Sequence, residues 1–354
     1  MRTDELEKIA KRRKLDLVLV ADQANIRALT SINCDNAIVA IKRLSGCAVE
    51  KFDVALYTDF RYVPMVHRVA PKLKCRDLKR FTGEKRNPFR FRRIGYESTI
   101  SHARFLEWQK KFPKAIFVDI AKDIAAIRAV KTPDEIAALR AAEKLNCEIW
   151  EMARGKFRAG MTERQMARII QKLMIEKGEG EAFSTIVCVG KNAAECHHEP
   201  DDTVWNGREP VLVDMGVKLN GFCSDLTRNH FNTEAQRHRG LYGKVYSLVL
   251  EANRAAIAAA KPGMTGKQLD KVARDMIKKG GFGKCFGHSL GHGVGYEIHE
   301  SPYASKKGKM VLKPGMLVTI EPGIYLEDNL GVRIEDLVLI TETGCEVLSA
   351  DADK

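Results

Sequence analysis

The sequence predicts two domains, an α/β domain followed by an α+β domain. The chain has 354 residues, which is enough for two hydrophobic cores. Helical and strand-like patterns alternate in the first third, whereas strand-like runs occur in blocks from residue 181 onward. Because the pattern changes near residues 125–130, we expect the domains to span residues 1–127 and 128–354.

The first domain is predicted from short elements of alternating type. An amphipathic segment near residues 4–13 indicates an opening helix, and SHARFLEWQKKF at 101–112 indicates another. Apolar runs predict buried strands at LDLVLVAD (15–22), NAIVAI (36–41) and DVALYTD (53–59). This alternation favours a sheet covered by helices.

The second domain is predicted to begin with two capped helices. Thr132 is suited to the N-cap, with Pro133 at the first helical position and Glu135 completing a capping box. Thr162 and Gln165 repeat this pattern at the next helix. Strand-like runs then follow at 181–190, 209–217, 221–231, 315–326 and 331–341, with a helical stretch among them.

Composition limits the class of protein. No run of about 18 apolar residues predicts a membrane span, and nine cysteines without a CxxC pair favour free thiols in a reducing cytoplasm. The net charge is +13, and its densest part is residues 76–93 with interleaved phenylalanines. That stretch is open to two interpretations: the first is a nucleic-acid patch, and the second is a solvated basic face or a subunit contact. We favour the second because no DNA- or RNA-binding motif accompanies it.

Residues 287–302, GHSLGHGVGYEIHESP, place three histidines among four glycines. Single histidines are commonly surface residues and glycines commonly mark turns, so this stretch alone does not decide between a loop and a site. Glycine also lets the backbone approach a ligand closely. A metal or catalytic site is therefore one of two open interpretations.

Four carboxylates stand where unpaired charge is costly. Asp214 ends the apolar run VLVDMG, and the others lie in or beside strand-like segments: Asp225 in GFCSDLTR, Glu321 in VTIEPG and Glu335 in GVRIED. Each alone is explained by a turn or by an ion pair with Arg228 or Arg333. Together with a histidine they suit divalent metal ions, and two ions about 3.5–4 Å apart share bridging carboxylates. The residues thus favour metal-assisted hydrolysis.

In this order the motifs DMG, SDLTR, GHSLGHGVGYEIHESP, IEPG and GVRIED resemble the pita-bread metallopeptidases, which include methionine aminopeptidase, prolidase, aminopeptidase P and creatinase. NIRALTSI and LYTDFRY resemble the creatinase-type N-terminal domain, and FSTIVCVGKNAAECHHEP resembles the proline-peptidase subgroup. The resemblance implies an α/β creatinase-like N-terminal domain. It also implies an α+β pita-bread catalytic domain with a curved, mainly antiparallel sheet.

The resemblance also implies the roles of individual residues. Two divalent ions, with Mn expected ahead of Co, Zn or Fe, would be held by Asp214, Asp225, His292, Glu321 and Glu335. Five catalytic residues are implied: His197 contacting the substrate, His288 lining the leaving-residue side, His299 stabilising the oxyanion, Glu321 shuttling a proton and Arg333 orienting a ligand.

The implied reaction is cleavage between an N-terminal residue and proline by a metal-bridging hydroxide, in a cytoplasmic homodimer acting on dipeptides or short peptides. Dipeptidase and aminopeptidase P activities both remain open, although Phe183 weakly favours a prolidase-like pocket. Methionine aminopeptidase is disfavoured by the N-terminal domain, and creatine hydrolysis by the five retained ligands. A non-catalytic relative that binds partners through its basic surface is the remaining alternative.

Some positions depart from the family pattern. Ala28 and Ser31 stand where the N-terminal motif usually has tyrosine and glycine, and Cys196 stands where proline is usual before the two histidines. His230, in TRNHF, has no role that the resemblance implies. None of these positions is an implied metal ligand, so the departures bear on specificity rather than on chemistry.

Overall fold

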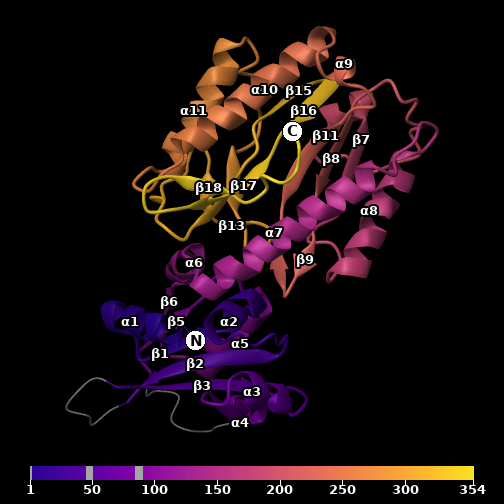
Figure 1. Cartoon of the computed structure of the whole chain (residues 1–354). Helices are drawn as coiled ribbons and strands as arrows, with labels where there is room; N and C mark the ends of the chain where they lie inside the picture. The colour runs from indigo at the N-terminus through magenta and orange to yellow at the C-terminus, as the bar shows by residue number, and fades with distance from the viewer. Residues whose placement is uncertain (1, 45–50, 84–90) are drawn as a thin grey trace. The chain divides into compact units, whose positions relative to one another are not determined.

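The computed structural model describes residues 2–44, 51–83 and 91–354. The chain forms two compact units, Met1–Arg128 and Ala129–Lys354. Figure 1 shows the first in indigo to purple and the second in magenta to yellow. Each unit is described by itself below.

The first unit is built on a six-stranded mixed sheet with the order β4-β3-β2-β1-β5-β6. β1 pairs antiparallel with β2 and parallel with β5. The strands are β1 (Leu17–Val20), β2 (Ala37–Arg43), β3 (Phe52–Thr58), β4 (Lys74–Asp77), β5 (Arg93–Tyr96) and β6 (Ile116–Asp119). The helices are α1 (Thr3–Arg13), α2 (Gln23–Thr30), α3 (Val63–Val69), α4 (Leu78–Gly83), α5 (His102–Lys111) and α6 (Ala121–Ala129).

The side chains of this sheet alternate between two cores. In β1, Val18 and Val20 join the core beneath α1, α2, α3 and α6, whereas Leu17 and Leu19 join Trp108 of α5 in the second core. The α/β prediction for the first domain is confirmed, and its three expected strands are β1, β2 and β3. The short strands β5 and β6 escaped prediction because RIGY and IFVD lack the longer apolar run, LDLVLVAD, that indicated the equally short β1.

The second unit contains the longer helices, which are α7 (Pro133–Arg154), α8 (Glu163–Lys177), α9 (Glu234–Arg237), α10 (Gly240–Ala259) and α11 (Gly266–Lys279). Both predicted capping boxes are present. The Thr132 hydroxyl accepts the Glu135 N–H, the Thr162 hydroxyl accepts the Gln165 N–H, and each N3 side chain accepts the N–H of its N-cap. These caps fix where the two helices start.

The strands of the second unit pair antiparallel, as predicted. A 3₁₀ helix, η2, spans Gly190–Ala194. The strands are β7 (Ile186–Val189), β8 (Val211–Met215), β9 (Lys218–Leu219), β10 (Phe222–Cys223), β11 (Leu226–His230), β12 (Gly291–Gly293), β13 (Glu300–Ala304), β14 (Leu317–Ile320), β15 (Gly323–Leu326), β16 (Leu330–Arg333), β17 (Asp336–Ile340) and β18 (Cys345–Val347).

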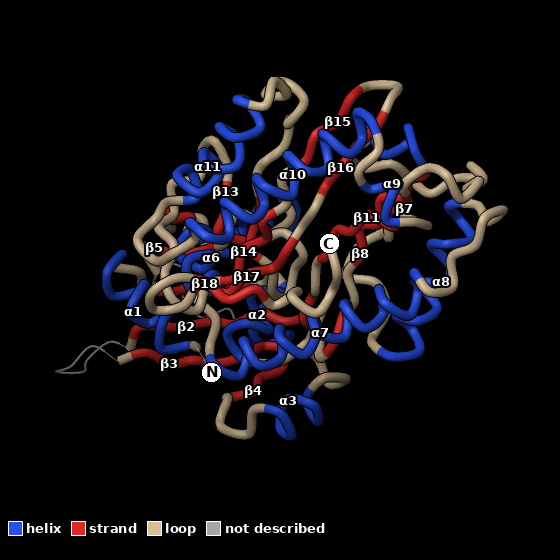
Figure 2. Tube along the Cα trace, turned by 45° about the horizontal axis from the view of Figure 1, so that its top comes forward, coloured by secondary structure: helices blue, strands red, loops and turns tan. Residues whose placement is uncertain are grey.

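Two hydrophobic cores divide this unit into halves. In the first half, α7 and α8 pack on the β11-β8-β7 sheet, with Trp150 and Val213 among the buried residues. In the second half, α10 and α11 pack on β14, β16 and β17 around Val249 and Val318. Figure 2 shows α10 and α11 side by side over their strands. Each half therefore supplies strands to the region between them.

The basic stretch at 76–93 is only partly described. Residues 84–90 lie outside the described residues, so its predicted role as a solvated face stays a prediction. Before that gap, the Arg76 guanidinium pairs with Asp53 at 2.8 Å and donates to the Tyr57 hydroxyl at 3.0 Å. Among the helices of the described chain, none combines the length and the apolar character that crossing a membrane requires.

Candidate metal centre

The five predicted ligands come from both halves of the second unit. Asp214 lies within β8 and His292 within β12. The other three stand in breaks between consecutive strands: Asp225 between β10 and β11, Glu321 between β14 and β15, and Glu335 between β16 and β17. Three sequence runs that looked continuous are thus interrupted at a carboxylate.

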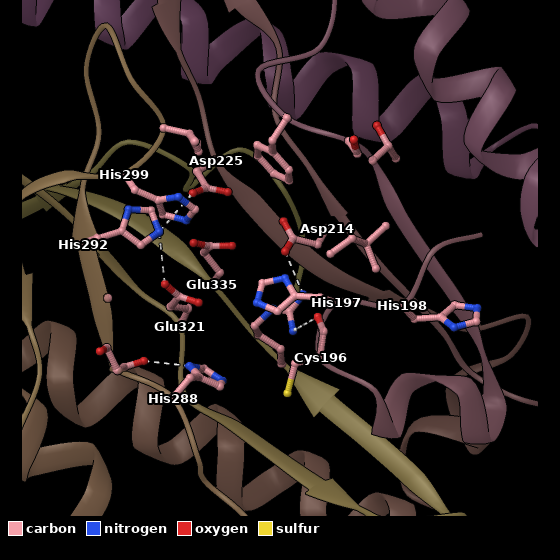
Figure 3. Close-up of a pocket in the computed structure, with 18 of the residues that line it drawn as sticks. Cys196, His197, His198, Asp214, Asp225, His288, His292, His299, Glu321 and Glu335 are labelled. Atoms are coloured by element: carbon pink, nitrogen blue, oxygen red, sulfur yellow. Dashed lines mark hydrogen bonds and ion pairs between the residues drawn. The ribbon is translucent and has the colours of Figure 1, made fainter. Parts of the chain in front are cut away.

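These side chains converge on one small region. His292 Nε2 lies 3.3 Å from Glu321 Oε1 and 3.6 Å from Asp225 Oδ2. Donor atoms of Asp225, His292 and Glu335 all lie within 4.8 Å of one another. Figure 3 shows the carboxylates of Asp214, Asp225, Glu321 and Glu335 turned toward the same space as His292. The structure therefore brings all five predicted ligands together.

The electrostatics of this cluster are those of a cation site. Burial raises the pKa values of Asp225 and Glu335 well above their ordinary range, and neighbouring carboxylates raise them further. Burial likewise raises the pKa of Glu321 to about 8. So many carboxylates repel one another at neutral pH unless a positive charge lies among them.

Two further observations match a metal ion. Burial lowers the pKa of His292 to about 4, which keeps the imidazole in the neutral form that binds metals. The buried Oδ1 of Asp214 has no hydrogen-bond partner within the described chain, so it is an oxygen available to a cation. Oxygen-rich donors with one imidazole suit hard or borderline divalent ions, and the residues fit them.

Sequence reasoning missed several residues that orient the ligands. Thr227 donates to Glu335 Oε2 at 2.7 Å, and Thr319 donates to Glu321 Oε1 at 3.1 Å. Thr227 follows Asp225 by two residues and Thr319 precedes Glu321 by two. Asp225 and Glu321 stand in breaks between strands, and Thr227 bonds to Glu335 rather than to Asp225, so this spacing alone does not predict the contacts.

Arg333, predicted to orient a ligand, hydrogen-bonds to Asp214. Its Nη2 donates to Asp214 Oδ2 at 2.7 Å and its Nε donates to the Thr227 hydroxyl at 3.1 Å. Arg333 is 4% exposed, so its charge lies beside the carboxylates with little solvent screening. Arg333 thereby fixes one oxygen of Asp214 and leaves the other oriented elsewhere.

Glu143 of α7 is a second support that the sequence did not indicate. Its Oε2 accepts the backbone N–H of Asp225 at 3.1 Å. Burial raises the pKa of Glu143 to about 8. No local pattern links a helix residue to a strand break 82 positions later, so only the tertiary structure shows this contact.

A cavity of about 470 Å³ contains the cluster. All nine residues predicted from the sequence line it: His197, Asp214, Asp225, His288, His292, His299, Glu321, Arg333 and Glu335. Apolar side chains, including Phe183, Ile298 and Tyr303, form other parts of its wall. The cavity thus combines a charged end with surfaces that can accept a hydrophobic group.

The predicted catalytic histidines differ in their surroundings. The ring centroids of His299 and His292 lie 4.4 Å apart, and burial lowers the pKa of His299. His288 donates from Nδ1 to Ser289 O at 2.7 Å, which leaves Nε2 to accept the Tyr325 hydroxyl at 2.9 Å. Arg333 Nη1 in turn donates to Tyr325, a residue that sequence reasoning missed.

His230, which had no predicted role, lies outside this cavity. Its ring packs edge-on against Phe157 at 5.4 Å and Trp205 at 5.2 Å. Burial lowers its pKa to about 4, so it is a neutral ring in an aromatic cluster. Both aromatic partners belong to the core that α7 and α8 cover, so His230 packs at the edge of that core.

Family models match most of the chain. Residues 137–342 match the model described as metallopeptidase family M24, and residues 2–130 match the creatinase/prolidase N-terminal domain. Together these matches account for both units of the fold.

Individual relatives agree with the family models. The chain is 40% identical over 260 residues to a Xaa-Pro dipeptidase of Pyrococcus furiosus. The aligned region covers 72% of this chain and 73% of that protein. The solved prolidase of Pyrococcus furiosus superposes with a TM-score of 0.87 and 34% identity over 98% of this chain and 99% of its own. An X-Pro aminopeptidase of Thermotoga maritima gives a TM-score of 0.83 and 30% identity over 97% of both chains.

Proposed function

The chain belongs to metallopeptidase family M24, and we propose that it hydrolyses the peptide bond between an N-terminal residue and proline. The observation that carries this proposal is the five-donor cluster inside a cavity with an apolar wall. The relatives named above, a Xaa-Pro dipeptidase and an X-Pro aminopeptidase, support the same substrate class. The proposed catalytic domain is residues 128–354, preceded by a creatinase-like domain of residues 1–127.

Two divalent ions would be held by Asp214, Asp225, His292, Glu321 and Glu335. When bound, they would supply Lewis-acid polarisation of the scissile carbonyl and lower the pKa of water. The protein's part is to orient these ligands, through Arg333 on Asp214 and Thr227 on Glu335. We expect Mn²⁺ in the cell, because an oxygen-rich donor set accepts it and no thiolate takes part.

The remaining polar side chains act on the substrate. His299 is positioned to donate to the oxyanion, and Glu321 to carry a proton toward the leaving nitrogen. His197 and His288 line the same cavity. There they would contact the two residues that flank the scissile bond. Glu321 lies in the same cavity, and a carboxylate there can accept a proton and return it.

Selection of proline follows from the chemistry of its amide. The amide before proline is tertiary and has no N–H. A cavity wall that offers no hydrogen-bond acceptor at that point can therefore bind this amide without leaving a donor unpaired. Phe183 and Ile298 give the cavity apolar surface for the pyrrolidine ring. Peptides with a secondary amide at this bond would bury an unpaired N–H, which costs about 1–3 kcal/mol.

Location and assembly belong to the same proposal. The eight described cysteines that can be assessed are unpaired, which supports a reducing cytoplasm. A homodimer is proposed by resemblance to the proline-peptidase subgroup. Sedimentation of the purified chain tests it.

The decisive experiment compares four peptides: Xaa-Pro, Xaa-Pro-Xaa, Xaa-Ala-Xaa and Met-Ala-Xaa. Chelator-stripped protein is assayed with Mn²⁺, Co²⁺ or Zn²⁺ added, with Glu335→Gln as the matched control. Cleavage of the proline peptides alone supports the proposal, and the dipeptide-to-tripeptide ratio separates dipeptidase from aminopeptidase P. Cleavage of Met-Ala-Xaa instead, or of no peptide by metal-loaded protein, contradicts it.

A further inference from the structure

One buried carboxylate outside the metal cluster gathers an unusual number of hydrogen bonds. Glu163, the first residue of α8, is fully buried. It accepts four donors, all from residues 189–201: Val189 N at 2.6 Å, Asn192 Nδ2 at 2.9 Å, His198 Nε2 at 2.7 Å and Asp201 N at 3.1 Å. A single side chain on a helix thus anchors a segment of thirteen residues at four points.

Glu163, His198 and Asp201 also have the composition of a cation site, but their geometry argues against one. Both oxygens of Glu163 already accept backbone N–H groups, from Val189 and Asp201. The carboxylate of Asp201 accepts the Thr203 N–H at 2.7 Å. Donor hydrogens thus occupy the sides of these carboxylate oxygens that a metal ion would need. We therefore interpret this cluster as an anchor that holds residues 189–201 to α8.

The anchored segment forms one wall of the catalytic cavity. Cys196, His197 and Glu199 lie on it and line the cavity. Figure 3 shows His197 facing the carboxylate cluster, whereas His198 points away from it. His198 also lines the cavity, but its ring bonds to Glu163 of α8, whereas His197 faces the carboxylates.

We propose that Glu163 and His198 are positioning residues that hold His197 against the substrate. This inference rests on the proposed function, because it takes His197 to be a substrate contact. Removing either partner releases the segment and lets His197 leave its place, while the five metal ligands keep theirs on other elements.

The hydrogen bond between His198 and Glu163 favours the protonated form of the imidazole. Burial alone would lower the pKa of His198, but the hydrogen bond and charge of Glu163, together with Glu195 and Asp201, raise it. A protonated imidazole donating to a buried carboxylate is stronger than a neutral pair. Glu195 contacts the other ring nitrogen at 3.4 Å and is 72% exposed, so it adds little.

The test uses three variants and a matched control. His198→Ala and Glu163→Gln should raise KM for a Xaa-Pro peptide about tenfold, with kcat within about threefold of wild type and unchanged metal content. His198→Gln, which keeps a donor near Nε2, should restore most of the affinity. Glu195→Gln, which alters the exposed partner of the same ring, should behave as wild type. If Glu163→Gln does not fold, the two His198 variants decide alone.

A double-mutant cycle tests whether His198 acts through His197. Adding His198→Ala to His197→Ala should raise KM by less than about twofold, because the contact is already lost. Fully additive effects in folded protein, or a wild-type KM in His198→Ala, would overturn the inference. So would a loss of metal parallel to the loss of affinity.

A readout independent of activity separates this inference from the proposed function. Cys196 adjoins His197, so release of the segment should speed its alkylation by iodoacetamide at least threefold in His198→Ala. Peptide mass spectrometry follows Cys196, with Cys75 of the first unit as the internal reference. If the wild type cleaves no proline peptide, the proposed function fails, and the Cys196 rate still decides the anchor: an unchanged rate contradicts it.

Discussion

The two units of this protein treat charge in opposite ways. Residues 1–128 hold 28 Lys and Arg against 15 Asp and Glu, whereas residues 129–354 hold 31 of each. The first unit therefore carries the whole net charge of +13. Yet among the described residues it buries only two of its Asp, Glu, His, Lys and Arg side chains, Glu97 and Arg128, while the second unit buries thirteen.

This difference shows where the chemistry resides. Charge on a surface is solvated and costs little, whereas buried charge persists only with partners. The second unit, which has no net charge, buries ionisable side chains in the candidate metal cluster and in residues such as Arg228 and Glu163. Net charge alone would have directed attention to the wrong unit. The following predictions break or sharpen this comparison.

The largest effect is expected at the metal cluster. Glu335→Ala should lower kcat/KM at least about 10³-fold, because it removes an oxygen ligand from the proposed metal centre. The fold should survive, since one of several mutually repelling carboxylates is lost. Activity and metal content are measured together, with the exposed Glu342→Ala as control. Near-wild-type turnover with added Mn²⁺ would refute the five-ligand site.

The next effect concerns stability. Arg228, 1% exposed, pairs with Asp336 at 3.0 Å and donates to the carbonyls of Ser349 and Ala352. Arg228→Met should cost about 3–5 kcal/mol of unfolding free energy, because it leaves Asp336 with only Lys354 as a cationic partner and removes the donors to the Ser349 and Ala352 carbonyls. Urea unfolding measures this, and the double variant with Asp336→Asn should recover part of the loss. Unchanged stability in Arg228→Met would contradict the account.

A smaller effect is expected in the first unit, where Glu97 is buried. Burial raises its pKa to about 7, although the N–H groups of Asp22 and Ala21 oppose this. The folded state thus binds the proton more tightly than the unfolded chain. Proton binding by Glu97 therefore stabilises the folded state, and this contribution is complete below pH about 4.3. It falls by about 2–4 kcal/mol as the pH rises toward 7.

Hydrogen exchange of the α2 amides at pH 5 and pH 8, corrected for intrinsic rates, measures this pH dependence. Protection should be higher at pH 5 in wild type, and the difference should vanish in Glu97→Gln. Equal protection at both pH values in the wild type would show that Glu97 keeps an ordinary pKa.

The smallest effect is expected on the basic surface. Lys8, Lys72 and Lys110 are exposed. Each single Lys→Gln change should alter the free energy of unfolding by less than about 0.5 kcal/mol. The triple variant should keep kcat/KM within about twofold of wild type. Peptide assays at low salt check this. A large loss of activity would mean that the charge of the first unit takes part in catalysis.

Sequence reasoning recovered the parts of the site that lie in local motifs. Asp214, Asp225, His292, Glu321 and Glu335 each sit in a short pattern of glycine and apolar residues, and all five converge in the structure. The helix caps at Thr132 and Thr162 were predictable because their partners lie three residues away. Such signals are contained within a few positions of the chain.

The supports were harder to predict because they depend on tertiary contacts. Glu143 meets Asp225 across 82 positions, and Glu163 meets His198 across 35. Each lies on a helix where a glutamate usually faces solvent, so local pattern gave no reason to single it out. Only packing of the helices against the strands reveals that these carboxylates are buried.

The most direct test of the central claim is a titration of metal into chelator-stripped protein. Mn²⁺ is added in known equivalents, and hydrolysis of a Xaa-Pro peptide and bound metal are measured in the same samples. The account predicts no hydrolysis without metal and a rise that saturates at two equivalents per chain, lost in Glu335→Ala. Hydrolysis by metal-free protein, or saturation of binding without any cleavage, would contradict it.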